Sequence, residues 1–214
     1  MLLAIDTSGP FCSAAIADGT KVISSQSEEL GRGHAERLMP LLEELLDQAL
    51  VEWTDVTKVA CTTGPGSFTG LRVGLATARG LALALNCPCV GVSVFEAMAT
   101  NQPMPLGVVM DAKRDQLWLQ TFNKDGDAFG KPLATPIADA LSHIPPTVFH
   151  LAGSGASILA SQDKRFKLIN EFASPPIEGV LRCASSDNSI LDKPKPLYLR
   201  APDAKPQQPA ILKS

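Results

Sequence analysis

The chain has 214 residues, of which 45% are hydrophobic, 19% are charged and 5% are aromatic, and its net charge is −3. This composition predicts a packed core and excludes wholesale disorder. It also argues against a protein that binds nucleic acid by itself, because phosphate contacts need clustered Lys and Arg and single strands need aromatic stacking surfaces.

The five cysteines indicate reduced thiols rather than a disulfide framework. Their number is odd, and the one close pair, Cys87-Pro88-Cys89, has no second cluster with which to hold zinc. No basic-then-apolar signal peptide precedes the first apolar run, and the longest apolar run, 71–85, is interrupted by Arg72 and Arg79. We therefore expect a cytoplasmic protein without a membrane span.

The first half of the chain predicts an α/β unit that opens with three antiparallel strands. A hairpin turn is expected at Asp18-Gly19, leucines recur at helical spacing from His34 onward, and Ser93 is placed to cap a short helix. The expected strands are residues 2–5, 12–17, 21–25, 59–62 and 90–92, and the expected helices are residues 34–50, 70–85 and 94–100.

The second half restarts near Asn101 and repeats a coarse plan, in which a strand that ends in Asp is followed by a hairpin. The expected strands are residues 106–110, 116–122, 148–151 and 166–169, and the expected helices are residues 137–142 and 156–161. The run 181–193 matches no element. We expect an N-terminal lobe (1–102), a smaller C-terminal lobe (103–195) and a proline-rich segment (196–214) that is partly mobile.

The most informative stretch is Gly64-Pro65-Gly66-Ser67-Phe68-Thr69-Gly70-Leu71-Arg72-Val73-Gly74, between a predicted strand and a predicted helix. Glycines let backbone N–H groups approach a ligand, and the dipole of a helix N-terminus favours an anion. The alternative is a tight strand-to-helix turn with Thr69 as the helix cap. A Walker A loop is excluded, because no Gly-Lys-Ser/Thr follows.

Two carboxylates add to the candidate anion site. Asp6 ends the first strand, followed by two hydroxyls, and could hold a magnesium-phosphate group, while Asp111 ends the first strand of the second half. The alternative is an aspartate that serves as a turn or cap residue. The candidates for nucleotide or anion binding are Asp6, Thr7, Ser8, Gly64, Gly66, Ser67, Thr69 and Asp111.

No catalytic or metal site can be assembled from the sequence. The three histidines are not at ligand spacing, and Ser67 and Ser154 have no evident His–Asp partners.

The predicted helix 70–85 is apolar almost all round, with small residues at spacings of three and four. Such a helix must be buried on nearly every side, so we expect a subunit interface formed with the helix 34–50. The alternative is a helix enclosed within the monomer. The expected interface residues are Leu38, Leu41, Leu42, Leu45, Leu71, Gly74, Leu75, Ala78 and Leu81. Gly74→Leu or Ala78→Glu is expected to prevent association.

Four segments carry a resemblance to a known family: Leu3-Ala4-Ile5-Asp6-Thr7-Ser8, the stretch 64–74, Asp111-Ala112-Lys113-Arg114 and Leu197-Tyr198-Leu199-Arg200. Together they resemble the bacterial TsaB (YeaZ) family. The likeness covers about residues 1–200 and is densest in the first 115. It implies the two-lobed, actin-like ATPase fold of acetate kinase, sugar kinases and Hsp70, here with a reduced second lobe.

The resemblance also implies a function. The family is similar to TsaD, the catalytic protein that makes threonylcarbamoyladenosine at position 37 of tRNA with a metal held by an HxxxH motif. This chain lacks that motif, which fits a non-catalytic scaffold that activates TsaD together with the ATPase TsaE. The family implies a homodimer when alone, contacts through the two N-terminal helices, and tRNA binding only through the complex. No cofactor is assigned to this chain itself; ATP and magnesium are candidates in the complex.

Two other functions stay open at this point. One is an autonomous ATPase or small-molecule kinase that uses Asp6, Asp111 and the glycine turn. The other, less favoured, is a metallopeptidase, which the absence of paired histidines disfavours.

Overall fold

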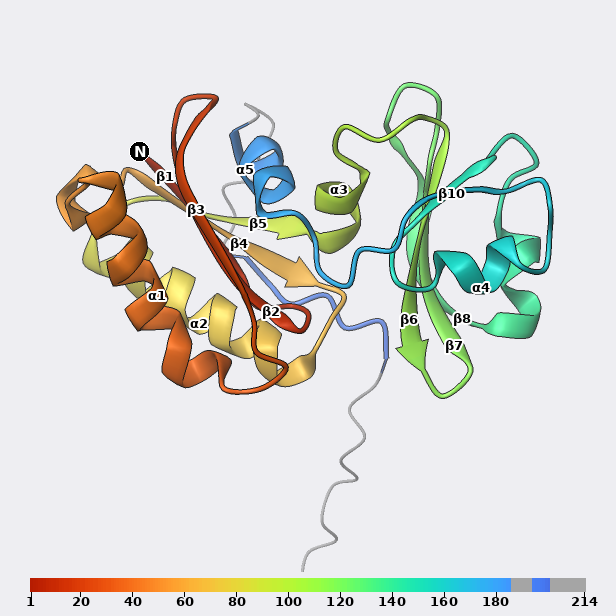
Figure 1. Ribbon diagram of the computed structural model, residues 1–214, viewed down its shortest axis with the longest axis horizontal. Coiled ribbons are helices and arrows are strands. Elements are labelled where there is room, and N and C mark those ends of the chain that lie inside the picture. Colours follow the sequence, from red (N-terminus) through yellow and green to blue (C-terminus); the bar gives the residue numbers. More distant parts are fainter. Residues whose placement is uncertain (186–193, 201–214) are drawn as a thin grey trace, which may run out of the picture.

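A computed structural model describes residues 1–185 and 194–200 of the chain. These residues form two lobes that lie side by side, each built on a five-stranded mixed sheet (Figure 1). The first sheet has the order β3-β2-β1-β4-β5, with β1 (Leu2–Asp6), β2 (Phe11–Asp18), β3 (Lys21–Glu29), β4 (Lys58–Gly64) and β5 (Cys89–Ser93). The second has the order β10-β9-β6-β7-β8, with β6 (Leu106–Lys113), β7 (Gln116–Phe122), β8 (Ala128–Pro136), β9 (His150–Ala152) and β10 (Lys167–Asn170).

The two sheets have the same topology. In each, a central strand (β1 or β6) pairs antiparallel with the next strand in the chain and parallel with a later one (β4 or β9). The repeated plan that the sequence indicated is therefore present in both lobes. The helices are α1 (His34–Ala49), α2 (Phe68–Ala84), α3 (Val94–Ala99), α4 (Ala156–Ala160) and α5 (Ile177–Ser185), with 3-10 helices η1 (Trp53–Asp55) and η2 (Ile137–His143).

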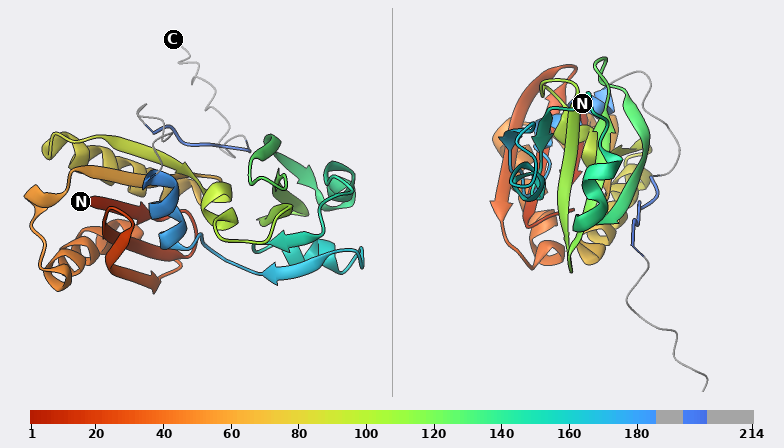
Figure 2. Two further views of the ribbon diagram at one scale, coloured as in Figure 1. Left: turned by 90° about the horizontal axis from the view of Figure 1, so that it is seen from above. Right: turned by 90° about the vertical axis from the view of Figure 1, so that its right-hand side faces the viewer.

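The first sheet is covered on both faces. The strand β1 is buried along its whole length, as expected for a parallel-paired central strand. The helices α1 and α2 pack on one face around Leu3, Ile5 and Leu75, and α5 packs on the other around Ala4 and Val180. The views in Figures 1 and 2 show the pair of long helices on the side of the sheet opposite α5.

The second sheet also separates two layers. The elements η2 and α4 cover one face, around Leu117 and Leu151, while α3 fills the other through Phe95 and Met98. The edge strand β8 was not predicted from the sequence. It contains Gly130 and two prolines. Proline lacks the backbone N–H that a central strand donates to its neighbours, but at the edge of a sheet one side of the strand has no neighbour, so proline is tolerated there.

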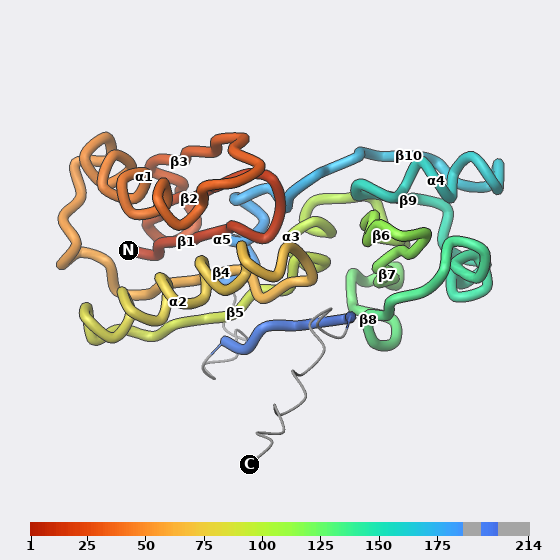
Figure 3. Tube along the Cα trace, turned by 90° about the horizontal axis from the view of Figure 1, so that it is seen from below, coloured from red at the N-terminus to blue at the C-terminus, as the bar shows by residue number. Residues whose placement is uncertain are grey.

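Within the described residues, the chain passes between the lobes three times. It crosses from α3 to β6, returns from β10 to α5, and crosses again in the described segment 194–200, which runs along the first lobe toward β8 (Figure 3). The sequence had assigned residues 103–195 to the second lobe. The helix α5 within that range instead packs on the first sheet, because Ile177, Val180, Leu181 and Ala184 form an apolar stripe that fits there.

Three described elements, β8, α5 and the short η1, were not expected. Every other described element corresponds to an expected one, with ends that differ by a few residues. The expectations about 186–193 and 201–214, including the mobile tail, lie outside the described residues. Among helices of the described residues, none combines the length and apolarity that crossing a membrane requires.

Candidate functional site

The first candidate site lies where β1 ends. Asp6, Thr7 and Ser8 are all buried there. Thr62 Oγ1 donates a hydrogen bond to Asp6 Oδ1 over 2.6 Å, and the Ser8 amide donates to the same oxygen over 3.1 Å. The other carboxylate oxygen has no hydrogen-bond partner among the described residues. Burial raises the pKa of Asp6 above its ordinary value, and the hydrogen bonds from Ser8 and Thr62 oppose this rise.

The glycines of the turn 64–74 are explained by packing within the chain. A Cβ atom on Gly66 would overlap the carbonyl oxygen of Ser8, and one on Gly70 would overlap that of Thr7. Ser67 N donates to Ser8 O over 2.7 Å, and Thr7 Oγ1 donates to Gly70 O over 2.8 Å. Only glycine therefore allows the start of α2 to lie against the β1–β2 loop.

The cap of α2 differs from the expected one. Ser67, not Thr69, is the N-cap, and its hydroxyl accepts a hydrogen bond from the Gly70 amide over 3.2 Å. Thr69 lies inside the first turn with an exposed side chain. An N-cap side chain accepts a hydrogen bond from a backbone amide two or three residues later in the chain. Ser67 stands at that distance before Gly70, whereas Thr69 is already inside the helix.

The eight candidate anion-binding residues are not all brought together. Those from the first lobe converge on the β1–β2 loop, but Asp111 lies in the second lobe and pairs with Lys113 Nζ over 2.7 Å, which lowers its pKa. The inner side of the glycine turn faces the Ser8 carbonyl, and Asp6 is fully buried. In this structure these residues therefore do not fit a magnesium-phosphate group, and anion binding by Ser67 and Thr69 stays a prediction.

The second candidate site is the helix pair. Eight of the nine expected interface residues are buried inside the chain's own first lobe: Leu38, Leu41, Leu42, Leu45, Leu71, Gly74, Leu75 and Ala78; the ninth, Leu81, is half-buried. They face the sheet because a helix that covers a sheet must direct one apolar stripe inward. Substitutions such as Gly74→Leu or Ala78→Glu would therefore disturb the fold itself rather than an interface.

The outward face of α2 is a different set of residues, which we call the outer α2 face. Its exposed members have short or apolar side chains, and a Cβ atom added to Gly80 would meet no atom within 4 Å. The most exposed large one is Leu83, at 84%. The outer α2 face comprises Val73, Ala76, Thr77, Gly80, Leu83 and Ala84. The sequence signal that could have separated this set is helical phase, since these positions lie opposite Leu71, Leu75 and Ala78.

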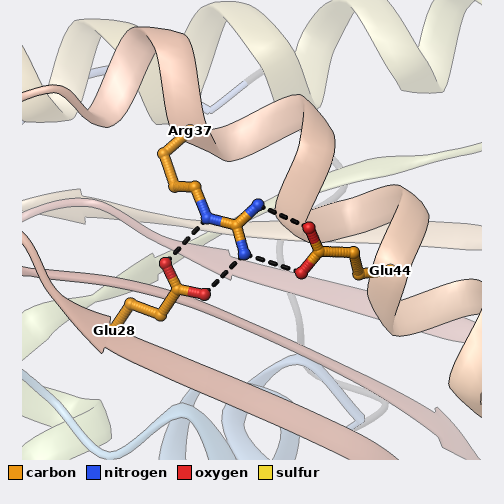
Figure 4. A network of polar contacts seen from close by, with 3 residues as sticks. All are labelled: Glu28, Arg37 and Glu44. Carbon is orange, nitrogen blue, oxygen red and sulfur yellow. Dashed lines mark hydrogen bonds and ion pairs between the residues drawn. The ribbon is translucent and has the colours of Figure 1, made fainter.

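The neighbouring helix α1 presents charge instead. Its exposed positions include Glu36, Glu43, Glu44 and Asp47. Arg37 lies between two of the carboxylates of this region, donating through Nε to Glu28 on β3 over 2.7 Å and through Nη1 to Glu44 over 2.8 Å (Figure 4). These hydrogen bonds lower the pKa of both glutamates. The outer surface of the helix pair is thus acidic along α1. Along α2 the exposed Ala76, Gly80 and Leu83 lie beside two exposed cations, Arg72 and Arg79.

Two of the sequence motifs meet across the lobes. The β6–β7 turn holds Lys113, Arg114 and Asp115 in the left-handed region, and the Arg200 guanidinium donates to the Ala112 carbonyl over 3.0 Å and to Gln116 Oε1 over 2.7 Å. In the same segment Leu197 N donates to Thr63 O over 2.7 Å. Residues 194–200 therefore bind both lobes, which spacing in the sequence could not show.

Several proteins resemble the chain in sequence or in structure. The family model for TsaD, the tRNA N6-adenosine threonylcarbamoyltransferase, matches residues 20–176. The Escherichia coli tRNA threonylcarbamoyladenosine biosynthesis protein TsaB is 34% identical over 130 residues, 58% of this chain and 55% of that protein. The chain thus matches about half the length of that relative. The structure of YeaZ from Pseudomonas aeruginosa has a TM-score of 0.76 at 26% identity, over 92% of this chain and 99% of that one.

The chain belongs to the TsaB (YeaZ) family. A more distant structure supports the fold alone. The activator of the 2-hydroxyisocaproyl-CoA dehydratase from Clostridium difficile, solved with ADPNP, has a TM-score of 0.51 at 12% identity, over 86% of this chain and 91% of that one. With the paired sheets, it confirms the expected two-lobed actin-like ATPase fold. Among the described residues, no group of three or more His, Cys, Asp or Glu side chains could hold a metal ion.

Proposed function

We propose that the chain is a non-catalytic subunit in the biosynthesis of threonylcarbamoyladenosine in tRNA, which binds and activates TsaD together with the ATPase TsaE. Membership of the TsaB (YeaZ) family supports the role in this modification. The single observation that carries the partner role is the outer α2 face, which exposes Leu83 beside residues with short side chains and is flanked by the exposed Arg72 and Arg79. Exposed apolar surface of this kind is typical of an interaction site.

The chemistry of the helix pair defines the partner surface. Short side chains at Ala76 and Gly80 let a second backbone approach α2 closely, and burial of Leu83 supplies free energy. The acidic face of α1 favours a partner with Lys or Arg opposite Glu43 and Asp47. In the absence of TsaD, a second copy of the chain would cover the same apolar strip, which gives the homodimer, and tRNA would be reached only through the complex.

An autonomous ATPase is less well supported. Magnesium and phosphate would have to bind at Asp6 and at the inner side of the glycine turn. Asp6 is buried, and the Ser8 carbonyl occupies the inner side of the turn. Calorimetric titration of the isolated chain with ATP and magnesium should therefore give no binding in the micromolar range. Micromolar binding would favour the ATPase over the subunit role.

The proposal is tested by reconstituting threonylcarbamoyl transfer to tRNA with purified TsaD and TsaE, with and without this chain. We expect transfer to depend on the chain. The control is an assay of this chain alone, which should give no transfer. Full activity of TsaD and TsaE without the chain would contradict the proposed function.

A further inference from the structure

Two cysteines on neighbouring strands lie on the face of the first sheet that α2 covers. In the parallel pair β4–β5, Val59 lies opposite Cys89 and Cys61 lies opposite Gly91, so the two thiols are diagonal neighbours. Both belong to the core side that α2 covers: Cys61 is fully buried, while Cys89 is partly exposed. The two side chains therefore lie on the same face of neighbouring strands.

Cys89 is reached from a groove of about 740 Å³ beside α2. The groove is lined by Arg79, Leu83, Cys87, Cys89, Pro194 and Lys195, among others. Arg79 donates a hydrogen bond to the Pro194 carbonyl, which holds the guanidinium at the groove. Among the described residues that line the groove there is no carboxylate, and the two charged side chains beside the thiol, Arg79 and Lys195, are both cationic. A partly exposed thiol in an electropositive environment is the setting of reactive cysteines.

The five cysteines, all within the described residues, differ in their electrostatics. The neighbouring Cys61 thiol and then the charge of Arg79 lower the pKa of Cys89. The pKa of Cys61 is raised, first by the neighbouring Cys89 thiol and then by burial. Burial raises the pKa of Cys12 to about 11 and raises those of Cys87 and Cys183. Cys89, which is partly exposed and lies beside Arg79, is therefore the cysteine whose thiolate is most favoured.

We propose that Cys89 is a thiol-modification site that reacts with hydroperoxides, and that Cys61 resolves the product as a disulfide between β4 and β5. The Cys89 thiolate attacks the terminal peroxide oxygen and the O–O bond breaks, so that hydroxide leaves from hydrogen peroxide, or an alkoxide from an alkyl hydroperoxide. The sulfur is oxidised by two electrons to a sulfenic acid and the peroxide is reduced. The Cys61 sulfur then attacks the Cys89 sulfur, the S–O bond breaks, and the hydroxide leaves as water with the Cys61 proton. This inference is independent of the proposed tRNA-modification role.

The reactivity is tested on the isolated full-length chain, without any substitution. Short treatment with iodoacetamide near neutral pH, followed by peptide mass spectrometry, gives the alkylation rate at each cysteine. We expect Cys89 to react faster than Cys12 and Cys183 by about tenfold or more, because only its thiolate is both exposed and favoured by charge. Equal rates at Cys87, Cys89 and Cys183 would overturn the proposal.

Hydrogen peroxide then tests the resolving thiol. A peptide map of the oxidised chain should show a Cys61–Cys89 linkage, and Cys87→Ala should leave that linkage intact. Cys61→Ala should instead leave a sulfenic acid on Cys89 that dimedone traps. A Cys87–Cys89 linkage in the unsubstituted chain, or no disulfide at any cysteine while Cys89 is oxidised further, would contradict the assignment of Cys61.

Two substitutions of Arg79 separate the effect of its charge on Cys89 from the effect of its packing: Arg79→Gln removes the charge and Arg79→Lys keeps it. The neutral variant should slow alkylation of Cys89 severalfold, while the lysine variant should keep most of the rate because it keeps the charge. An unchanged rate in Arg79→Gln would show that the cation does not favour the thiolate.

Discussion

The two faces of α2 have similar compositions and opposite surroundings. On the inner face, Gly70, Gly74 and Ala78 are buried against the β1–β2 loop and the first sheet. On the outer face, Ala76 and Gly80 are exposed. A short side chain permits close approach of a second backbone, but that backbone can belong to the same chain or to another. Small residues in a helix therefore predict that another backbone packs closely against it, but they do not show whether that backbone belongs to the same chain or to a partner.

The largest expected effect separates the two faces through stability. Gly70→Ala should lower the free energy of unfolding by about 2–3 kcal/mol, because its Cβ would overlap the Thr7 carbonyl. The matched substitution Gly80→Ala meets no atom and should raise stability by about 0.5–1 kcal/mol through better helix propensity. Urea denaturation of the two variants measures both changes. Equal effects would show that the start of α2 does not pack as described.

The outer face should govern self-association. Leu83→Asp introduces a charge at a side chain that is 84% exposed, so the fold should be retained. If the homodimer uses the outer α2 face, its dissociation constant should rise at least about tenfold, equivalent to about 1.4 kcal/mol. Sedimentation velocity over a concentration series measures this constant. A homodimer of unchanged affinity would place the interface on another surface.

A smaller effect should follow from loosening the segment 194–200. Arg200→Ala removes the hydrogen bonds to the Ala112 carbonyl and to Gln116, which should cost about 1–2 kcal/mol because a charged donor is lost. Limited proteolysis should then cut this segment faster, while Leu197 still binds Thr63. Arg200→Lys, with one amine in place of a planar fork, should restore protection only in part.

The smallest effect concerns the charged face of α1, and it depends on pH. Arg37 lowers the pKa of Glu28 and Glu44 in the folded chain, so the stability it adds is present above their ordinary pKa and is lost as pH falls through the lowered values. Arg37→Gln should therefore lower the melting temperature slightly near neutral pH and leave it unchanged in strong acid. A difference that grows in acid would contradict this sign.

The sequence predicted most elements of the fold because their signals are local. Apolar runs of strand length, the leucines of α1 and the Ser93 cap each act within a few residues. The strand β8 was missed because its prolines are compatible with an edge position that only the assembled sheet defines. The Arg200 contact with the β6–β7 turn joins residues more than 80 positions apart, so no local pattern reports it.

The candidate site was less predictable for the same reason. The glycines of the turn were singled out as a candidate anion site, whereas the structure packs Gly66 and Gly70 against carbonyls of the β1–β2 loop, which is far away in the sequence. The expected interface residues were chosen by apolarity, and apolarity is greatest on the face that the chain buries itself. Helical phase in the sequence separates the two sides of α2, but tertiary packing decides which side faces the sheet and which remains for a partner.

Binding of TsaD to two arginine variants tests the central claim most directly. Ala76→Arg lies on the outer α2 face and Ala138→Arg lies on η2 of the second lobe, and both alanines are exposed. If the outer α2 face binds TsaD, Ala76→Arg should weaken binding at least about tenfold in calorimetry, while Ala138→Arg should bind as the unsubstituted chain does. Equal, tight binding of TsaD by both variants would contradict the assignment of this face as the partner surface.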